Sequence, residues 1–177
     1  MESSKQILTE DTIRDVLFKA YSNYADVVVT KWRGWTIYGT GGKGEKMPLR
    51  RELDIARFQR SMRQYLSPSI TLTGYEVKGM VGTNDTTRFP YYGEGLDQAI
   101  ALLDEGADYS YFVWPEPDDE IKKALETMIS RYCPLIGILF VMNTKSMWEY
   151  RKAGKNTHTN DCCQLSWWRS LLRFACS

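Results

Sequence analysis

The chain has 177 residues, of which 43% are hydrophobic and 13% aromatic, and its formal net charge is +1. A chain of this length and composition can bury one substantial core, which excludes an intrinsically disordered protein. The near-zero charge excludes a broadly basic surface, so any surface that binds nucleic acid must be local.

The N-terminal residues lack an apolar signal core, and no apolar run approaches the roughly 18 residues that a membrane span needs. We therefore expect a cytoplasmic or otherwise intracellular protein. The four cysteines lack zinc-ligand spacing, and the single histidine, His158, lies in a polar run. These patterns indicate neither a zinc site, nor a disulfide framework, nor histidine-based acid–base catalysis.

The first predicted element is an amphipathic helix. Thr9 is placed as its N-cap, Glu10 and Asp11 stand in its first turn, and apolar residues recur at helical spacing from Ile13 to Tyr24. Glu10 falls at the edge of the apolar stripe. It is therefore either a favourable charge at the helix N-terminus or an acid that faces inward, towards a site.

The next segments predict strands separated by loops. Residues 26–30 and 35–38 have the composition of two strands, with a turn at Arg33 and Gly34. The glycine-rich run 39–46 lacks the order of a phosphate-binding loop, so we interpret it as a connector. Residues 49–58, which contain Asp54, fit either a strand or a helix, and the polar run 59–69 is expected to be a connection.

The segment from Ile70 to Gly79 alternates as a half-buried strand and ends with Glu76 and Lys78 on one face. A carboxylate and an ammonium at a strand end suit metal-assisted phosphodiester hydrolysis. The carboxylate holds a divalent cation, and the amine steadies the attacking water or the charge on the phosphate. The alternative is a solvated surface pair that contributes little.

The rest of the chain alternates between helical and strand patterns. Residues 80–93 form a long irregular stretch of the kind that is often functional. The elements that follow are a helix with Leu96 in its apolar stripe, the strand 109–114, a helix capped by Asp118 or Asp119, and the fully apolar strand 135–142. This order predicts an α/β three-layer sandwich with a central mixed sheet flanked by helices.

The composition changes after Asn143. Residues 144–177 are basic and aromatic, so we predict a domain over residues 1–143 followed by a C-terminal tail. Such a tail docks on its own domain, forms a homodimer, binds a protein partner or lies on a membrane surface.

A family resemblance rests on several short motifs in order. They are Asp54, then Glu76-Val-Lys78, then the segment 92–99 with Gln98, then 108–115, and finally 136–139. This series resembles the PD-(D/E)xK nuclease superfamily, which has the restriction-endonuclease-like fold, and the likeness covers roughly residues 13–143. It also favours a strand over a helix at Asp54.

The resemblance implies roles for these residues. Asp54 and Glu76 would hold Mg²⁺ or Mn²⁺, Lys78 would assist the nucleophile, and Gln98 would orient the site. Glu10 is a further candidate metal ligand. Candidate contacts to DNA are the basic and aromatic residues Lys43, Lys46, Arg50, Arg51, Arg57, Arg60, Arg63, Arg88, Tyr91 and Tyr92.

The leading hypothesis is therefore a metal-dependent deoxyribonuclease. The alternative is a non-catalytic interaction module, or a nucleic-acid-binding module, on a nuclease-like scaffold, such as a viral or mobile-element accessory protein. The near-neutral charge favours the module, and the set Asp54, Glu76 and Lys78 favours the enzyme.

Overall fold

A computed structural model describes residues 7–22, 27–33, 52–61, 69–83, 86–88, 92–104 and 106–157. The predicted segments and basic residues at 34–51 and 62–68, together with Tyr91 and residues 158–177, lie outside these ranges. The side chains of Arg60, Arg88 and Tyr92 also lie outside the described part. Among the described residues, no helix has the length and apolar character that crossing a membrane requires.

The described part is an α/β fold around a six-stranded mixed sheet in the order β1-β2-β3-β6-β7-β8. The central pairs β3–β6 and β6–β7 are parallel, and the three outer pairs are antiparallel. A separate hairpin is formed by β4 and β5. The helices and strands are α1 (Glu10–Ser22), β1 (Val27–Arg33), β2 (Glu52–Ser61), β3 (Ser69–Val77), β4 (Val81–Thr83), β5 (Thr86–Arg88), α2 (Tyr92–Asp104), β6 (Tyr109–Pro115), α3 (Asp119–Tyr132), β7 (Ile136–Asn143) and β8 (Ser146–Arg151).

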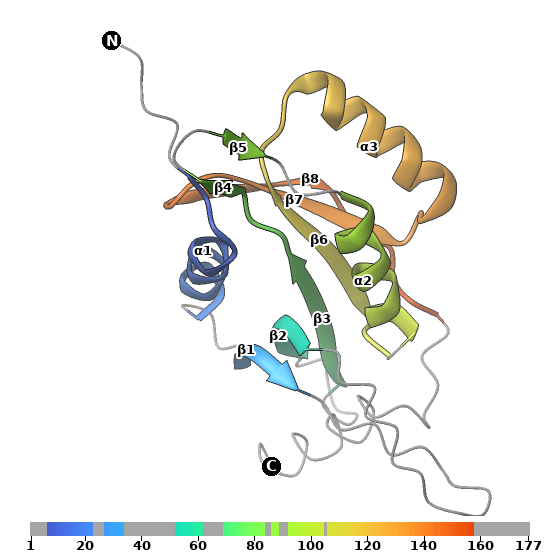
Figure 1. The fold of residues 1–177 in the computed structure, drawn as a ribbon. Helices are drawn as coiled ribbons and strands as arrows, with labels where there is room; N and C mark the ends of the chain where they lie inside the picture. The colour runs from blue at the N-terminus through green and yellow to red at the C-terminus, as the bar shows by residue number, and fades with distance from the viewer. Residues whose placement is uncertain are drawn as a thin grey trace, which may run out of the picture.

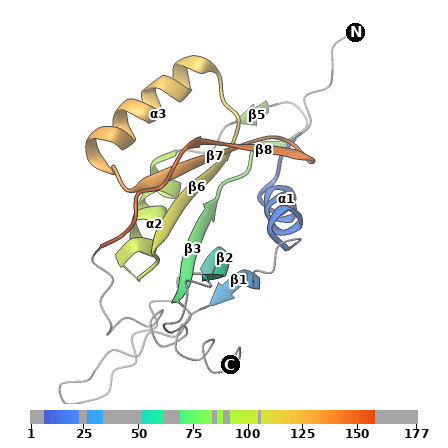
Figure 2. The same cartoon turned by 180° about the vertical axis from the view of Figure 1, so that it is seen from behind.

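The helices cover the sheet on both sides, as Figures 1 and 2 show, with α1 on one face and α2 and α3 on the other. The α1 face carries a core cluster that joins Ile13 and Leu17 to Ile55 and Tyr75 of the sheet. The opposite face packs α2 and α3 on alternating residues of the same strands, including Phe112. The predicted α/β class and flanking helices are confirmed.

Several boundaries differ from the sequence-based prediction. β1 continues through Arg33, where we predicted a turn, and β2 runs to Ser61, into the stretch predicted as a connection. The stretch predicted as irregular contains the β4–β5 hairpin, and α2 begins at Tyr92. The ambiguous segment around Asp54 is a strand, because its apolar neighbours Ile55 and Ala56 face cores on opposite sides of the sheet.

The sheet continues past Asn143, where we placed the start of the tail. β8 pairs antiparallel with β7, and its Trp148 and Tyr150 pack on Phe140. The amide of Asn156 then donates to the carbonyls of Leu103 and Ala107. The described part of the predicted tail is therefore built into the same sheet and core.

Candidate active site

Asp54 and Glu76 lie next to each other because β2 and β3 are antiparallel neighbours. Ile55 pairs with Tyr75 in the register, and Asp54 and Glu76 are the next residues along these two strands. Ile55 and Tyr75 pack in the core on the α1 side, so alternation directs the two acids away from that core. At this strand end Arg14 of α1 still reaches Asp54. Both acids are buried, with only 7% of Asp54 and 4% of Glu76 exposed.

Where the pairing between β2 and β3 ends, the carboxylate of Asp54 takes the place of a backbone hydrogen-bond acceptor. Its Oδ2 accepts a hydrogen bond of 2.8 Å from the N–H of Val77. On the other side of β3, the N–H of Lys78 donates to the carbonyl of Val113 in β6. The strand end is thus held on both sides, and the orientation of Asp54 is fixed by the sheet itself.

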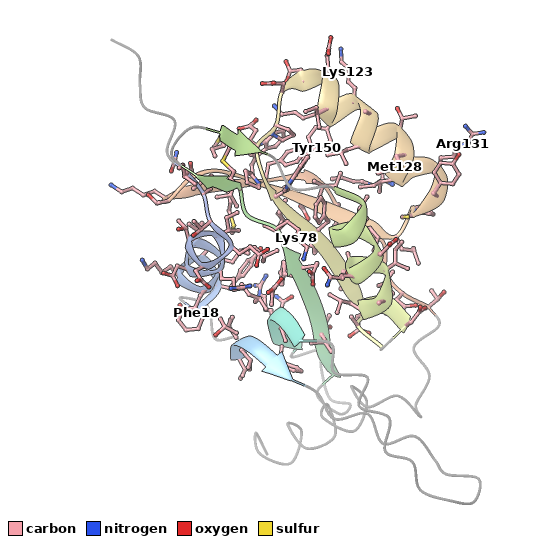
Figure 3. All side chains as sticks on the ribbon, in the orientation of Figure 1. Phe18, Lys78, Lys123, Met128, Arg131 and Tyr150 are labelled. Carbon is pink, nitrogen blue, oxygen red and sulfur yellow. The ribbon has the colours of Figure 1, made fainter. Side chains whose placement is uncertain are left out.

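Glu76 and Lys78 form an ion pair, with 3.0 Å between Oε1 of Glu76 and Nζ of Lys78. Figure 3 shows Lys78 between β3 and α2. A Cβ built on Gly95 of α2 would lie 2.9 Å from Cγ of Lys78 and 2.3 Å from the ring of Phe112. A residue without a side chain is therefore needed at Gly95 so that α2 can pack over the stem of this lysine.

The charge of Glu76 is poorly stabilised in the metal-free protein. Burial raises the pKa of Glu76 to about 7, and the negative charges of Asp54 and Glu10 add to this effect, whereas Lys78 opposes it. Burial is the larger cause, and the neighbouring acids add a local shortage of positive charge. Such a deficit is what a divalent cation would offset.

A third group, Arg14 of α1, also reaches the site. Its Nε and Nη2 lie 2.9 Å and 2.8 Å from Oδ1 of Asp54. Nη2 is also 3.0 Å from Oε2 of Glu10, and Nη1 is 2.6 Å from Oδ1 of Asp11. Burial alone would lower the pKa of Arg14, but the three carboxylates outweigh it and the pKa is raised.

The position of α1, and with it of Glu10, depends on another close approach. The N–H of Met80 donates to the carbonyl of Leu8, and a Cβ built on Gly79 would lie 2.1 Å from the backbone nitrogen of Glu10. The hydroxyl of Thr9 accepts from the N–H of Thr12, as the predicted N-cap requires. Glu10 is therefore held near Asp54, but the two are linked through Arg14.

The donor set fits a hard divalent cation held by two carboxylates. Mg²⁺ is commonly bound by one or two carboxylates and several waters, so Asp54 and Glu76 suffice. Within the described ranges, no three acidic, histidine or cysteine side chains gather closely enough to hold a metal ion. Glu10 therefore does not join Asp54 and Glu76 as a third ligand in this arrangement.

The other predicted site residues are placed elsewhere. Gln98 is exposed on α2, and no contact with the two acids is found for it in the part of the chain that is described. Arg57 lies on the α1 face, with its guanidinium 4.2 Å from the ring centre of Tyr21. There it borders a pocket of about 270 Å³ together with Tyr75 and Tyr111, across the sheet from Asp54 and Glu76.

Sequence reasoning missed Arg14, Gly79 and Gly95. The spacing of Glu10 and Arg14 is a recognised signal for a helical ion pair, so that contact could have been found. The contact from Arg14 to Asp54 spans 40 residues, and no local pattern indicates it. The two glycines are required by close approach to α1 and α2, which only the packed structure reveals.

Comparison of the chain with protein-family models, curated proteins and solved structures finds no match.

Proposed function

We propose that this chain is a metal-dependent nuclease that hydrolyses phosphodiester bonds in DNA. The observation that carries the proposal is the pair of buried, adjacent carboxylates, Asp54 and Glu76, with Lys78 bonded to the second of them. Structural carboxylates are rarely buried side by side, and the pKa of Glu76 is raised, first by burial and then by the charge of Asp54.

The arrangement supports the resemblance drawn from the motifs. The resemblance implies an Asp at the start of one strand and the Glu-x-Lys on the neighbouring strand. Here β2 and β3 are neighbours, and β6 lies parallel to β3 after α2. This agreement supports a restriction-endonuclease-like scaffold, and DNA as the substrate comes from the same resemblance.

In this proposal Asp54 and Glu76 bind the divalent ion, Mg²⁺ or Mn²⁺. The ion, when bound, would lower the pKa of a coordinated water and offset charge on the phosphate. Lys78, bonded to Glu76 in the metal-free protein, would donate a hydrogen bond to the attacking water or to a phosphate oxygen. Val77 keeps Asp54 oriented through its backbone N–H.

The proposal is tested by incubating the purified chain with linear, nicked, branched and single-stranded DNA in Mg²⁺ or Mn²⁺. We expect cleavage that EDTA abolishes and that Glu76→Gln greatly reduces. Glu120→Gln, an exposed position on α3, removes the same charge away from the site and should cleave normally. Inactivity on every substrate with both metals would contradict the proposal and favour the non-catalytic module.

A further inference from the structure

The guanidinium of Arg14 contacts one of the two carboxylates of the candidate site, that of Asp54. Two of its nitrogens are bonded to Oδ1 of Asp54, and one of these is shared with Glu10. The Arg14 side chain is only 12% exposed, so it is a partly desolvated charge and not a loose surface contact. This one guanidinium therefore pairs with two of the three acids that we predicted to bind a metal, Asp54 and Glu10.

The two oxygens of Asp54 differ in what holds them. Oδ2 is bonded to the N–H of Val77, which is part of β3 and cannot leave without breaking the sheet. Within the described part of the chain, the partner found for Oδ1 is Arg14, a long side chain that can adopt other rotamers. A cation that binds Asp54 would therefore approach through Oδ1 and compete with Arg14.

We propose that Arg14 is a built-in counter-ion that stabilises Asp54 in the metal-free protein and must leave Oδ1 when a divalent cation binds. The inference rests on the proposed function, because it assumes that Asp54 is a metal ligand. It makes Arg14 a competitor of the metal and not a catalytic residue. The same contact keeps a buried carboxylate paired until the metal arrives.

The opposite role for Arg14 is that of a positioning residue that holds Asp54 in the correct orientation for the metal. The two roles predict opposite signs. A competitor lowers metal affinity by occupying the ligand and by repelling a second cation, so its removal tightens binding. A positioning residue raises metal affinity, as outer partners of metal ligands generally do, so its removal weakens binding.

The test is calorimetric titration of Mn²⁺ and Mg²⁺ into the full chain and into Arg14→Met, which keeps an apolar stem of similar length. We expect the dissociation constant of Arg14→Met to be lower by roughly tenfold or more, since a unit charge in direct contact is removed. The matched control is Arg131→Met, which removes the same charge from an exposed position on α3. It should bind like wild type.

A second variant covers the case in which Arg14→Met does not fold, which circular dichroism would reveal. Arg14→Lys keeps the positive charge but cannot supply a planar fork to Asp54, Glu10 and Asp11 together. We expect it to bind Mn²⁺ several-fold more tightly than wild type. Unchanged or weaker binding in the folded variants would overturn the counter-ion role.

The outcomes also separate this inference from the proposed function. Tighter metal binding by the Arg14 variants without any DNA cleavage would support the counter-ion and contradict the nuclease. DNA cleavage by wild type, with equal or weaker metal binding in the variants, would overturn the counter-ion alone. Failure of every variant, wild type included, to bind either metal would overturn both.

Discussion

At the scale of single residues, the ionisation of Glu76 has a consequence for stability. The folded-state pKa is raised to about 7 from the ordinary 4.5, chiefly by burial and then by Asp54. Below pH 4.5 the group is protonated in the folded and unfolded chains alike. Between pH 4.5 and 7 only the unfolded chain loses the proton, so rising pH favours unfolding.

We therefore predict that, without metal, the free energy of unfolding of wild type relative to Glu76→Gln falls by about 3 kcal/mol from pH 4.5 to pH 8. The comparison with the variant removes the contribution of titrating groups that do not interact with Glu76. Urea denaturation in EDTA at a series of pH values measures the difference, and added Mg²⁺ should reduce the fall. Parallel pH profiles of the two proteins would show that Glu76 is not destabilised by its burial.

Lys78 is predicted to act on the chemical step and not on metal binding. Lys78→Met keeps the stem that packs against Gly95 and leaves both carboxylates in place. The single-turnover cleavage rate should fall on the order of 10² to 10³, the effect of losing one electrostatic contact in the transition state. Calorimetry should show that Mn²⁺ still binds. A variant that cleaves at the wild-type rate would remove Lys78 from the mechanism.

At the scale of elements, the approach of α1 to the end of β3 positions Glu10 and Arg14. Gly79→Ala would place a methyl group 2.1 Å from the backbone nitrogen of Glu10. Rotation of a side chain cannot relieve this clash, because the neighbouring atom belongs to the backbone. We expect a loss of about 2–3 kcal/mol in the free energy of unfolding, at the upper end for overpacking, together with an altered metal affinity.

Gly154→Ala is the matched control for this prediction. Its new methyl group would meet the Cδ2 atom of Leu135 at 2.8 Å, and the end of that side chain can move. We expect a clearly smaller loss than for Gly79→Ala. Equal losses in the two variants, measured by urea denaturation, would mean that α1 moves freely relative to β3.

The last strand is the element on which sequence and structure differ most. β8 stands at one edge of the described sheet. Its exposed Glu149, and the exposed Lys152 that follows it, give this stretch the composition of a solvated tail. Arg151 forms an ion pair with Glu126 of α3, and the side-chain amide of Asn156 donates to the carbonyls of Leu103 and Ala107. No local sequence pattern predicts these contacts. The apolar run of β7, by contrast, was predicted correctly because a strand covered on both faces is apolar throughout.

Truncation distinguishes a domain that ends at Asn143, as composition predicts, from one that needs β8 and Asn156. A chain that ends after Asn143 loses β8 and uncovers Phe140, so we expect it to be insoluble or unfolded. A chain that ends after Thr157 retains β8 and the Asn156 contacts and should give the circular dichroism spectrum of a folded α/β protein. A folded, soluble chain ending at Asn143 would restore the boundary predicted from composition.

At the scale of the whole molecule, the candidate site depends on three layers that meet at one end of β3. The sheet supplies Asp54, Glu76 and Lys78, α2 packs over the lysine, and α1 brings a guanidinium to Asp54. Alternation placed Glu76 and Lys78 on one face of a strand, and the family resemblance added Asp54, because both depend on local motifs. The contributions of both helices depend on tertiary packing, so sequence periodicity alone did not predict them.

The central claim is that Asp54 and Glu76 together bind one divalent metal ion, and a crystal structure of the chain grown with Mn²⁺ tests it most directly. We predict an anomalous-scattering peak at roughly 2.1 Å from one oxygen of each carboxylate, the usual distance for a hard divalent ion. The guanidinium of Arg14 should no longer be bonded to Oδ1 of Asp54. A fully occupied Mn²⁺ elsewhere, with none between Asp54 and Glu76, would contradict the account.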